Sequence, residues 1–333
     1  MHPYPLVLEP ILKEKVWGGR RLSDLGKDLP EGVMYGESWE LADLDATSAD
    51  GGGGDGAHSR IVNGEMRGLT LREAMTAMGP NLMGSVRATE TGAFPLLAKF
   101  LDAREHLSVQ VHPSPAYAAE HPWAHLKTES WYVVDADADG AIYRGVRAGV
   151  TPEEFRRAIE AGGVEELLVR VPVRAGDVHH LPSGTVHALG AGVLVAEVQT
   201  PSDTTFRVYD WGRSGRRLHV EEAMACIDFQ PRDGAALRSN GGERALLVST
   251  EYYTLSELRM GRGASRTEAL RTAHPVVWMV LRGDGRICAS DEGFSPVAIR
   301  AGATVLLPAS LGEVELFGDD DVVILEAKVA GGM

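Results

Sequence analysis

The chain has few cysteines and no long apolar run. Its two cysteines, Cys226 and Cys288, are too few and too far apart for a disulfide framework or a cysteine zinc site. No apolar run reaches the roughly 18 residues that span a bilayer. The segment up to Glu14 also lacks a basic start followed by an apolar stretch. These absences predict a cytoplasmic protein that is not bound to a membrane.

Basic residues are also in short supply. The chain has 33 Lys and Arg against 47 Asp and Glu, a formal net charge of −14, which gives no reason to approach a phosphate backbone. Nucleic acid is therefore not an expected partner. The 333 residues are 44% hydrophobic and 24% charged, so the chain can bury a sizeable core. That length allows two domains.

Three short helical insertions are predicted, at about residues 70–90, 114–125 and 151–169. Thr70 and Glu73 form a capping-box pattern before an apolar stripe. The pairs Ser114-Pro115 and Thr151-Pro152 are typical helix starts, with proline at the first helical position.

The rest of the chain reads as β. Its short runs are rich in Val, Tyr and Phe and are bounded by Gly, Pro or Asp, which favours an antiparallel sandwich or barrel. The glycine-rich stretch from Asp45 to His58 predicts a mobile surface loop. The β pattern resumes after Gly234, so we expect a main β domain over residues 1–234 and a smaller one over 235–333. The similar AGDVHHLPSG and AGATVLLPAS segments suggest a duplicated β-fold.

Strand alternation gathers polar side chains on shared faces. It puts Ser108, Gln110 and His112 on one face of a strand. It likewise puts Lys127 beside Glu129 and Trp131, whereas His187 follows a Pro-Ser-Gly turn back into a sheet. If these strands roll into a barrel, their polar groups share one interior and need partners there.

A divalent metal would satisfy four of these groups at once, namely Gln110, His112, Glu129 and His187. Zinc suits two imidazoles, a carboxylate and an amide oxygen. The alternative is that they are hydrogen-bonded residents of an antiparallel sheet. Neighbouring His179 and His180 face opposite sides of a strand, so only one could point inward.

Two cations admit both a functional and a structural interpretation. Arg207 shares a predicted strand face with Tyr209 and Trp211, and an arginine aimed into a barrel requires an anion. A surface salt bridge to Asp203 or Asp210 is the alternative. Lys127 could act as a general base beside a metal, or face solvent.

Four segments together resemble the type I phosphomannose isomerases of the cupin superfamily, in their short bacterial form. These are FPLLAKFLDAREHLSVQVHP (94–113), LKTESWYVV (126–134), LPSGTVHALG (181–190) and EVQTPSDTTFRVYDWGR (197–213). The stretches 13–22 and 36–41 look like the family's amino-terminal segment, so the likeness extends over about residues 5–230.

The resemblance implies a fold and a site. The fold is a mainly β cupin or jelly-roll barrel with short helical insertions and a second, smaller cupin-like carboxy-terminal domain. One zinc ion per chain would be held by Gln110, His112, Glu129 and His187. Of the catalytic residues, Arg207 would stabilise charge, Lys127 would transfer the proton and Asp203 would assist ring opening. Ser108 and Lys99 would lie near the sugar phosphate.

The implied reaction interconverts mannose 6-phosphate and fructose 6-phosphate by proton transfer between C1 and C2 through an enediol. Two alternatives stay open: a catalytically silent cupin that binds a sugar phosphate, and an isomerase that prefers glucose 6-phosphate. Leu126 stands where some relatives carry a histidine, so ring opening by that group cannot operate. Ser114-Pro115-Ala116 replaces an acidic or amide residue, which predicts a changed helix entry without loss of zinc. We expect a monomer or homodimer.

Overall fold

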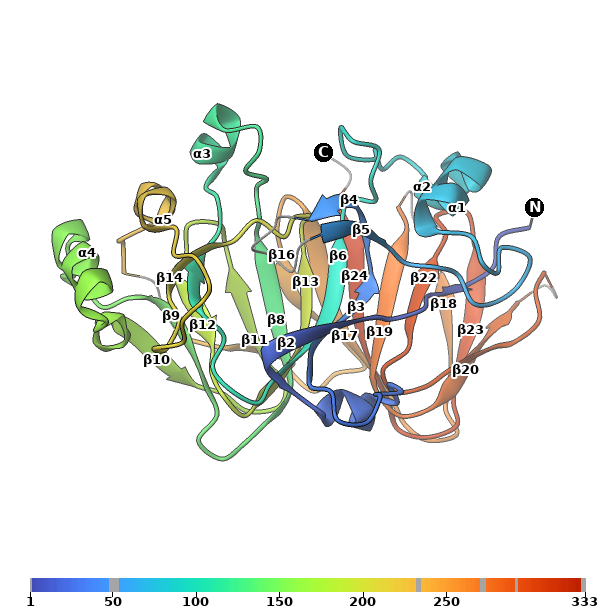
Figure 1. Ribbon diagram of the computed structural model, residues 1–333. Helices are drawn as coiled ribbons and strands as arrows, with labels where there is room; N and C mark the ends of the chain where they lie inside the picture. Colours follow the sequence, from blue (N-terminus) through green and yellow to red (C-terminus); the bar gives the residue numbers. More distant parts are fainter. Residues whose placement is uncertain (1, 48–53, 232–234, 270–273, 291–292, 331–333) are drawn as a thin grey trace.

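The strands form four layers that lie side by side in the computed structural model (Figure 1). The structure describes residues 2–47, 54–231, 235–269, 274–290 and 293–330. From left to right in Figure 1, the layers are sheets of five, seven, six and four strands. Strand pairing is antiparallel throughout these sheets, which confirms the predicted mainly β class.

The five-stranded sheet carries two helices on its outer face. Its strands, in spatial order, are β10 (Leu168–Pro172), β9 (Ala141–Val146), β12 (His187–Leu189), β7 (Val109–Val111) and β14 (Phe206–Tyr209). Helices α4 (Pro152–Ala161) and α5 (Val220–Cys226) cover it, because Phe155 and Ala223 pack against the outward residues Val111 and Val208.

The seven-stranded sheet faces the inner side of the five-stranded sheet. Its order is β15 (Leu237–Arg238), β11 (Asp177–Leu181), β8 (Glu129–Ala136), β13 (Val193–Gln199), β6 (Leu97–Ala103), β2 (Ile11–Gly19) and β3 (Tyr35–Leu41). Trp131 and Val195 of this sheet pack against Ile142 and Leu189 of the other. The two sheets therefore form a sandwich with a common interior.

The carboxy-terminal strands form a second sandwich. The six-stranded sheet has the order β1 (Leu6–Val7), β22 (Thr304–Leu307), β19 (Val276–Arg282), β24 (Val322–Val329), β17 (Tyr253–Met260) and β16 (Arg244–Ser249). The four-stranded sheet has the order β18 (Ser265–Ala269), β23 (Glu313–Gly318), β20 (Gly285–Ala289) and β21 (Val297–Ile299). Their shared core includes Trp278, Ile287 and Leu316.

The two sandwiches share one local pairing. Trp131 Nε1 donates to Glu197 Oε2 at 2.9 Å across β8 and β13, and Trp278 Nε1 donates to Glu326 Oε2 at 3.0 Å across β19 and β24. The AGDVHHLPSG and AGATVLLPAS segments form β11 and β22, one in each sandwich. The Trp–Glu hydrogen bond and the similar segments each occur once in both sandwiches, as expected if the β-fold is duplicated.

The sandwiches pack back to back through the seven- and six-stranded sheets. Apolar residues of both sheets fill most of this contact, among them Phe100 and Leu325. Polar bonds cross it as well, because Tyr253 Oη lies 2.9 Å from Ser130 Oγ. Strand β1 pairs with β22, so an amino-terminal strand lies in the carboxy-terminal sandwich. The division at residue 234 remains a prediction, and β1 crosses it.

The predicted helix starts are confirmed. Helix α1 (Leu71–Met78) has the Thr70–Glu73 capping box, and α2 (Pro80–Met83) follows it. Helix α3 (Pro115–Glu120) is capped by Ser114, and α4 has a capping box on Thr151. Single-turn 3₁₀ helices cover Arg21–Leu25 and Val164–Leu167. Helix α5 was not predicted, because His219 provides no side-chain cap.

The glycine-rich stretch differs from its prediction. Strand β4 (Asp43–Thr47) pairs with β5 (Gly54–His58) in a hairpin, so a mobile loop is wrong for these residues. Leu44 and Ala57 are buried against Trp39, which gives the hairpin an apolar anchor that its glycines concealed. Residues 48–53 of the predicted loop lie outside the described residues.

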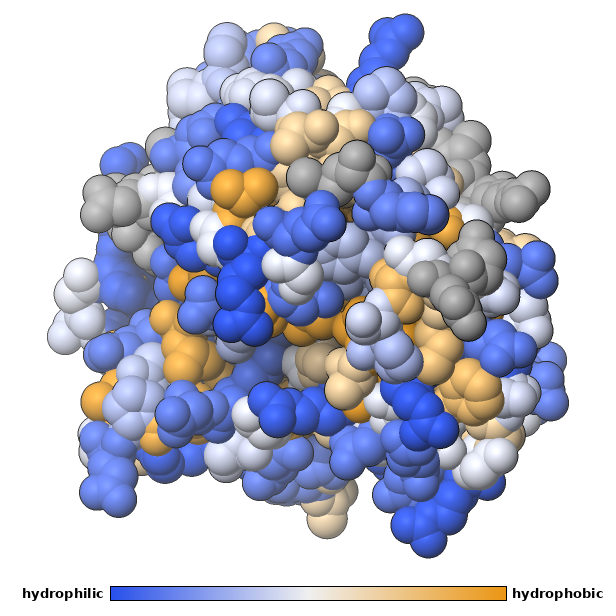
Figure 2. All heavy atoms as spheres, turned by 90° about the vertical axis from the view of Figure 1, so that its right-hand side faces the viewer, coloured by the Kyte–Doolittle hydropathy of each residue, from blue (hydrophilic) through white to orange (hydrophobic). Residues whose placement is uncertain are grey.

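The outer surface is mixed in character. Figure 2 shows the end formed by the carboxy-terminal strands, where hydrophobic side chains gather in small areas between hydrophilic ones. Within the described residues, no helix is both long and apolar enough to cross a membrane.

Candidate metal centre and active-site pocket

Three buried side chains converge inside the first sandwich. His112, Glu129 and His187 each offer a ligand atom, and these atoms all lie within 4.8 Å of one another. His112 follows β7, Glu129 opens β8 and His187 opens β12, so the group joins both sheets of the sandwich. None of the three is more than 1% exposed. The convergence predicted from the sequence is present for these residues.

Backbone carbonyls orient both imidazoles. His112 Nδ1 lies 3.0 Å from Thr204 O, and His187 Nδ1 lies 2.8 Å from Thr185 O. A carbonyl accepts only, so each Nδ1 carries a proton, and in the neutral ring this leaves the lone pair on Nε2. Both Nε2 atoms face Glu129, at 3.3 Å and 3.1 Å from its carboxylate oxygens. This arrangement prepares two nitrogens and a carboxylate for one cation.

Gln110 lies beside the cluster. It pairs with His187 across β7 and β12, and its Nε2 is 3.4 Å from His187 Nε2. A half-turn of the amide exchanges its nitrogen for its oxygen, which is the atom that binds metals. Gln110 therefore lies next to His187, and its role as the fourth ligand stays a prediction.

The donor set fits a zinc ion. His112 Nε2 and Glu129 Oε1 are buried without a hydrogen-bond partner. Buried polar atoms without partners are costly, and zinc prefers imidazole nitrogen and carboxylate oxygen. Burial and the nearby Lys127 ammonium lower the pKa of His112 to about 3, so the ring is in the neutral, metal-binding form.

Lys127 contacts the same carboxylate. Its Nζ lies 2.8 Å from Glu129 Oε2, and its side chain is 5% exposed. Burial opposes ionisation of Glu129, but the Lys127 ammonium outweighs it and holds the pKa of this carboxyl well below its usual range. Glu129 is therefore a carboxylate, able to bind a cation.

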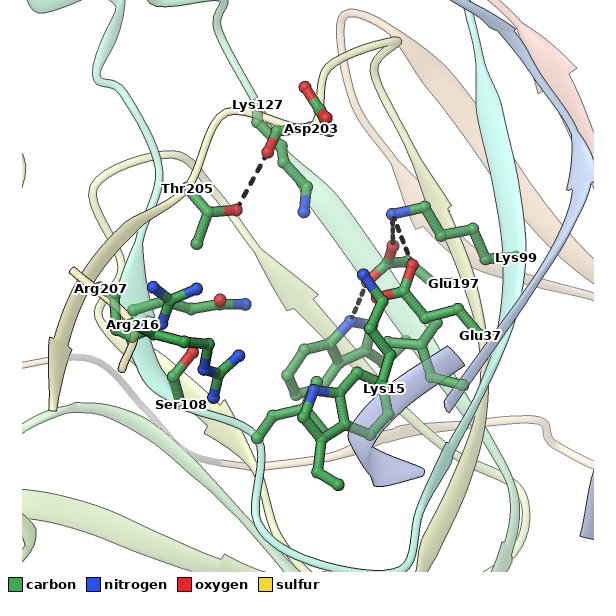
Figure 3. Close-up of a pocket in the computed structure, with 15 residues that line it drawn as sticks. Lys15, Glu37, Lys99, Ser108, Lys127, Glu197, Asp203, Thr205, Arg207 and Arg216 are labelled. Carbon is green, nitrogen blue, oxygen red and sulfur yellow. Dashed lines mark hydrogen bonds and ion pairs between the residues drawn. The ribbon is translucent and has the colours of Figure 1, made fainter. Parts of the chain in front are cut away.

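A pocket that is open at its mouth adjoins this cluster (Figure 3). Six of the predicted site residues line it: Lys99, Ser108, Gln110, Lys127, Asp203 and Arg207. Lys127 and Asp203 lie together at one end, with the Asp203 carbonyl accepting from Thr205 Oγ1 at 3.2 Å. Gln110 and Lys127, which contact His187 and Glu129, therefore line the same pocket as the other four residues.

Arg207 points into the pocket, but its predicted face companions do not. It pairs with Gln110 across β14 and β7, and a bulge separates it from Tyr209. The bulge breaks the two-residue alternation, so Tyr209 and Trp211 pack with the outer apolar cluster beneath α4 and α5. The shared face predicted for these three residues is wrong. Arg207 Nη1 donates to Arg217 O at 2.9 Å.

The opposite wall carries alternating charges. Lys99 Nζ lies 3.3 Å from Glu197 and 3.9 Å from Glu37, and Lys15 Nζ lies 3.2 Å from Glu37. Burial raises the pKa of Glu37, but the Lys15 and Lys99 ammonium groups lower it more and hold it at about 2. Each ammonium on this wall is thus matched by a carboxylate.

The doubtful histidines stay outside the metal cluster. His179 is buried on the face that carries Trp131, and burial lowers its pKa to about 4. His180 points to the other face, where its Nδ1 lies 3.0 Å from Ser130 Oγ. The two histidines thus face opposite sides of β11, as the alternation of side chains along a strand predicts.

Several pocket residues were missed from the sequence: Lys15, Trp17, Glu37, Thr205, Arg216 and Glu197. A signal existed for Glu197, because it interrupts the apolar run VLVAEVQ of β13 and faces Lys99 on β6. Arg216 gave no such signal, since it lies in a loop rich in arginine and glycine.

Comparisons with known proteins find relatives over nearly the whole chain. A model of the family "Phosphomannose isomerase type I, catalytic domain" matches residues 6–140. The mannose-6-phosphate isomerase of Streptococcus mutans is 37% identical over 328 residues, covering 96% of this chain and 97% of that protein. Mannose-6-phosphate isomerase ManA of Bacillus subtilis is 34% identical over 331 residues, covering 96% and 98%.

Solved structures also match over nearly the whole chain. The crystal structure of the mannose 6-phosphate isomerase from Bacillus subtilis matches with a TM-score of 0.82 at 30% identity, covering 97% of this chain and 99% of that one. A putative mannosephosphate isomerase from Archaeoglobus fulgidus matches with a TM-score of 0.75 at 19% identity, covering 98% of each chain. The second likeness concerns the fold alone.

Proposed function

The chain belongs to the type I phosphomannose isomerase family, an aldose-ketose isomerase family, and we propose that it interconverts mannose 6-phosphate and fructose 6-phosphate with one zinc ion per chain. The observation that carries the proposal is the buried His112, Glu129 and His187 cluster beside a pocket lined by Arg207 and by Lys127, which contacts Glu129. A silent sugar-binding module has no need for this combination of metal ligands and proton-carrying groups.

The cation would be held by His112, Glu129, His187 and Gln110. Bound there, zinc would polarise the sugar oxygens at C1 and C2. These four protein donors carry a single negative charge, so the site remains positive overall and suits an enediol with developing negative charge.

Lys127 is the proposed proton carrier. Acting as a base, its neutral amine takes the proton from C2 of the open-chain aldose and returns it to C1, while the O2 proton passes to O1. A cation at Glu129 competes with the ammonium for that carboxylate and so loosens the 2.8 Å ion pair that holds it. Arg207, buried beside Gln110, stabilises the charge on the sugar oxygens.

Asp203 is proposed to assist ring opening. It lines the pocket near Lys127, and Leu126 provides no alternative acid at the neighbouring position. Ser108 and Lys99 are proposed substrate contacts. Residues 235–333 are proposed as a supporting unit, since Tyr253 contacts Ser130 directly behind Glu129.

The test is direct. Metal-free and zinc-loaded protein are incubated with mannose 6-phosphate, and fructose 6-phosphate is followed by a coupled assay. We expect turnover only with zinc. His187→Ala should lose both bound zinc and turnover, because it removes one of the nitrogen ligands.

Two results would change the assignment. Zinc-loaded protein that binds mannose 6-phosphate without converting it would be a silent binding module. A larger kcat/KM for glucose 6-phosphate than for mannose 6-phosphate would identify an isomerase of the other epimer.

A further inference from the structure

Residues 200–205 connect strand β13 of the seven-stranded sheet to strand β14 of the five-stranded sheet. Asp203 lies in this 200–205 segment and lines the active-site pocket. Residues 200–203 also line a second cavity. Among the described residues, the segment contributes no side chain to an apolar cluster of either sandwich. Hydrogen bonds must therefore fix its position.

Gln199 supplies two of these bonds from the end of the sheet. It is the last residue of β13, which pairs with both β8 and β6, and its side chain is fully buried. Its Nε2 donates to Thr200 O at 2.9 Å and to Ser202 O. Both acceptors are carbonyls, so the amide nitrogen must face them and the amide has one orientation. Ser202 N donates to Thr200 O at 2.8 Å, so the chain turns around this amide.

The turn acts on residues of the proposed site. Asp203 directly follows Ser202, whose carbonyl Gln199 holds. Ser202 Oγ accepts from Thr204 N at 3.2 Å, and Thr204 O lies 3.0 Å from His112 Nδ1. A chain of hydrogen bonds therefore runs from the Gln199 amide to an imidazole of the metal cluster.

The 200–205 segment is also joined to the residues that precede β8. Thr200 N donates to Thr128 O at 3.1 Å, and Ser202 Oγ donates to His125 O at 3.1 Å. Lys127 lies between these two partners in the sequence. The position of the turn around Gln199 is thus transmitted to both segments at this end of the pocket.

The other half of the Gln199 amide has no partner. Gln199 Oε1 is buried without a hydrogen bond among the described residues. A buried acceptor without a partner costs free energy. An apolar side chain of similar length would avoid that cost. The bonds made by the amide nitrogen, rather than packing, therefore account for a glutamine at this position.

We propose that Gln199 is a positioning residue that sets Asp203 in the pocket and holds the Thr204 carbonyl against His112. Gln199 is not among the residues that line the pocket, so it acts through these neighbours. The inference rests on the proposed function for the roles of Asp203 and His112. Groups that orient metal ligands typically change metal affinity or activity by about 10- to 100-fold when they are removed.

The experiment replaces Gln199 by methionine, which is similar in length and has no donor. Zinc affinity is measured by competition with a chelator, and kcat and KM are measured with mannose 6-phosphate. Cobalt is then bound in place of zinc, because its visible absorption bands report the arrangement of the ligands. The Tm of each variant reports its stability.

Two variants serve as matched controls. Gln230→Met makes the same exchange at an exposed residue that does not line the pocket, so every readout should stay unchanged. Ile287→Val removes one methyl group from the core of the second sandwich and lowers stability there. This second control shows what a loss of stability alone does to the site.

We expect Gln199→Met to weaken zinc binding and to lower kcat by about 10-fold each, with a smaller change in KM. Its cobalt bands should differ from those of the wild type. Ile287→Val should lower the Tm and leave zinc affinity, cobalt bands and kcat unchanged. Wild-type values of these three readouts in Gln199→Met would overturn the proposal, and so would equal changes in Gln199→Met and Ile287→Val.

Asp203→Asn separates the two targets of Gln199. In that background Gln199→Met should lower kcat by a smaller factor than it does alone, because it acts in part through Asp203, whereas zinc affinity should fall by the same factor. Independent losses of kcat would contradict the action on Asp203. If Gln199→Met fails to fold, Gln199→Asn replaces it, since its shorter amide cannot reach Ser202 O, and the same outcomes apply.

The positioning role and the isomerase activity fail separately in this design. Wild-type protein that shows no turnover, together with weaker zinc binding and altered cobalt bands in Gln199→Met, would refute the isomerase and leave the role of Gln199 toward His112 intact. Turnover in the wild type, with zinc affinity, cobalt bands and kcat unchanged in Gln199→Met, would refute the positioning role and leave the isomerase intact.

Discussion

Lys127 Nζ lies 2.8 Å from Glu129 Oε2, and both side chains are buried. The proposed proton carrier and a proposed metal ligand are therefore in direct contact. A cation bound to Glu129 would compete with the Lys127 ammonium for the negative charge of this carboxylate. Metal binding would therefore weaken the ion pair that holds Lys127 and leave its amine freer to act as a base.

Lys127→Met should lower kcat by about 10²- to 10⁴-fold, the usual contribution of a general base. One zinc per chain should remain bound, since His112, Glu129 and His187 are unchanged. Steady-state kinetics and elemental analysis of the same sample check both statements.

Lys127→Arg is the matched control for charge. Arginine keeps the cation but stays protonated in proteins, so activity should not return. Recovery of kcat to within a few-fold of the wild type would show that Lys127 contributes charge rather than proton transfer.

Zinc should stabilise the folded chain. At a free concentration 100 times its Kd, a ligand that binds only the native state adds about 2.7 kcal/mol to the free energy of unfolding. His112→Ala should lose most of that gain. Thermal unfolding with and without zinc measures it, and His274→Ala, whose Nδ1 bonds Val329 O at 2.8 Å in the other sandwich, should keep the gain.

Gly302 should tolerate no side chain. A Cβ there would lie 1.9 Å from Leu25 O, and its φ of +80° is unfavourable for other residues. Gly302→Ala should cost roughly 3 kcal/mol or more. Gly312 has φ +85°, but a Cβ at that position would meet nothing within 4 Å, so Gly312→Ala should cost only about 1–2 kcal/mol. Equal denaturation midpoints for the two variants would contradict the steric argument.

Glu37 should make the free energy of unfolding depend on pH in the acidic range. Its pKa of about 2 lies below the value of an unfolded glutamate, so the folded chain gains stability above about pH 4.5 and loses it as the pH falls towards 2. The contribution is roughly 3 kcal/mol. This contribution is measured by comparing the unfolding free energy of the wild type and of Glu37→Gln as a function of pH. Parallel pH profiles would argue against the ion pairs of Glu37 with Lys15 and Lys99.

The metal cluster was predictable because it depends on local rules. Alternation along one strand placed Gln110 inward, and a glycine turn at Gly184 set the direction of His187. Helix starts at Thr70 and Thr151 were predictable for the same reason, since capping boxes involve residues three positions apart.

The remaining site was not predictable in this way. Arg216 depends on Asp210 and on the attachment of its loop to Leu107, contacts that no periodicity encodes. The bulge after Arg207 reversed the facing of Tyr209, and a single extra residue leaves no clear mark in the sequence. The hairpin around residues 43–58 depends on Trp39, which its glycine content did not reveal.

Strand β1 has a consequence for biosynthesis. Leu6 pairs with Leu306, so β1 leaves the ribosome long before its partner strand β22 is made. The first sandwich can form while β22 is still being synthesised, whereas β1 has no partner strand until then. Chaperone dependence should therefore concentrate in the second sandwich, which lies farther from the proposed catalytic centre.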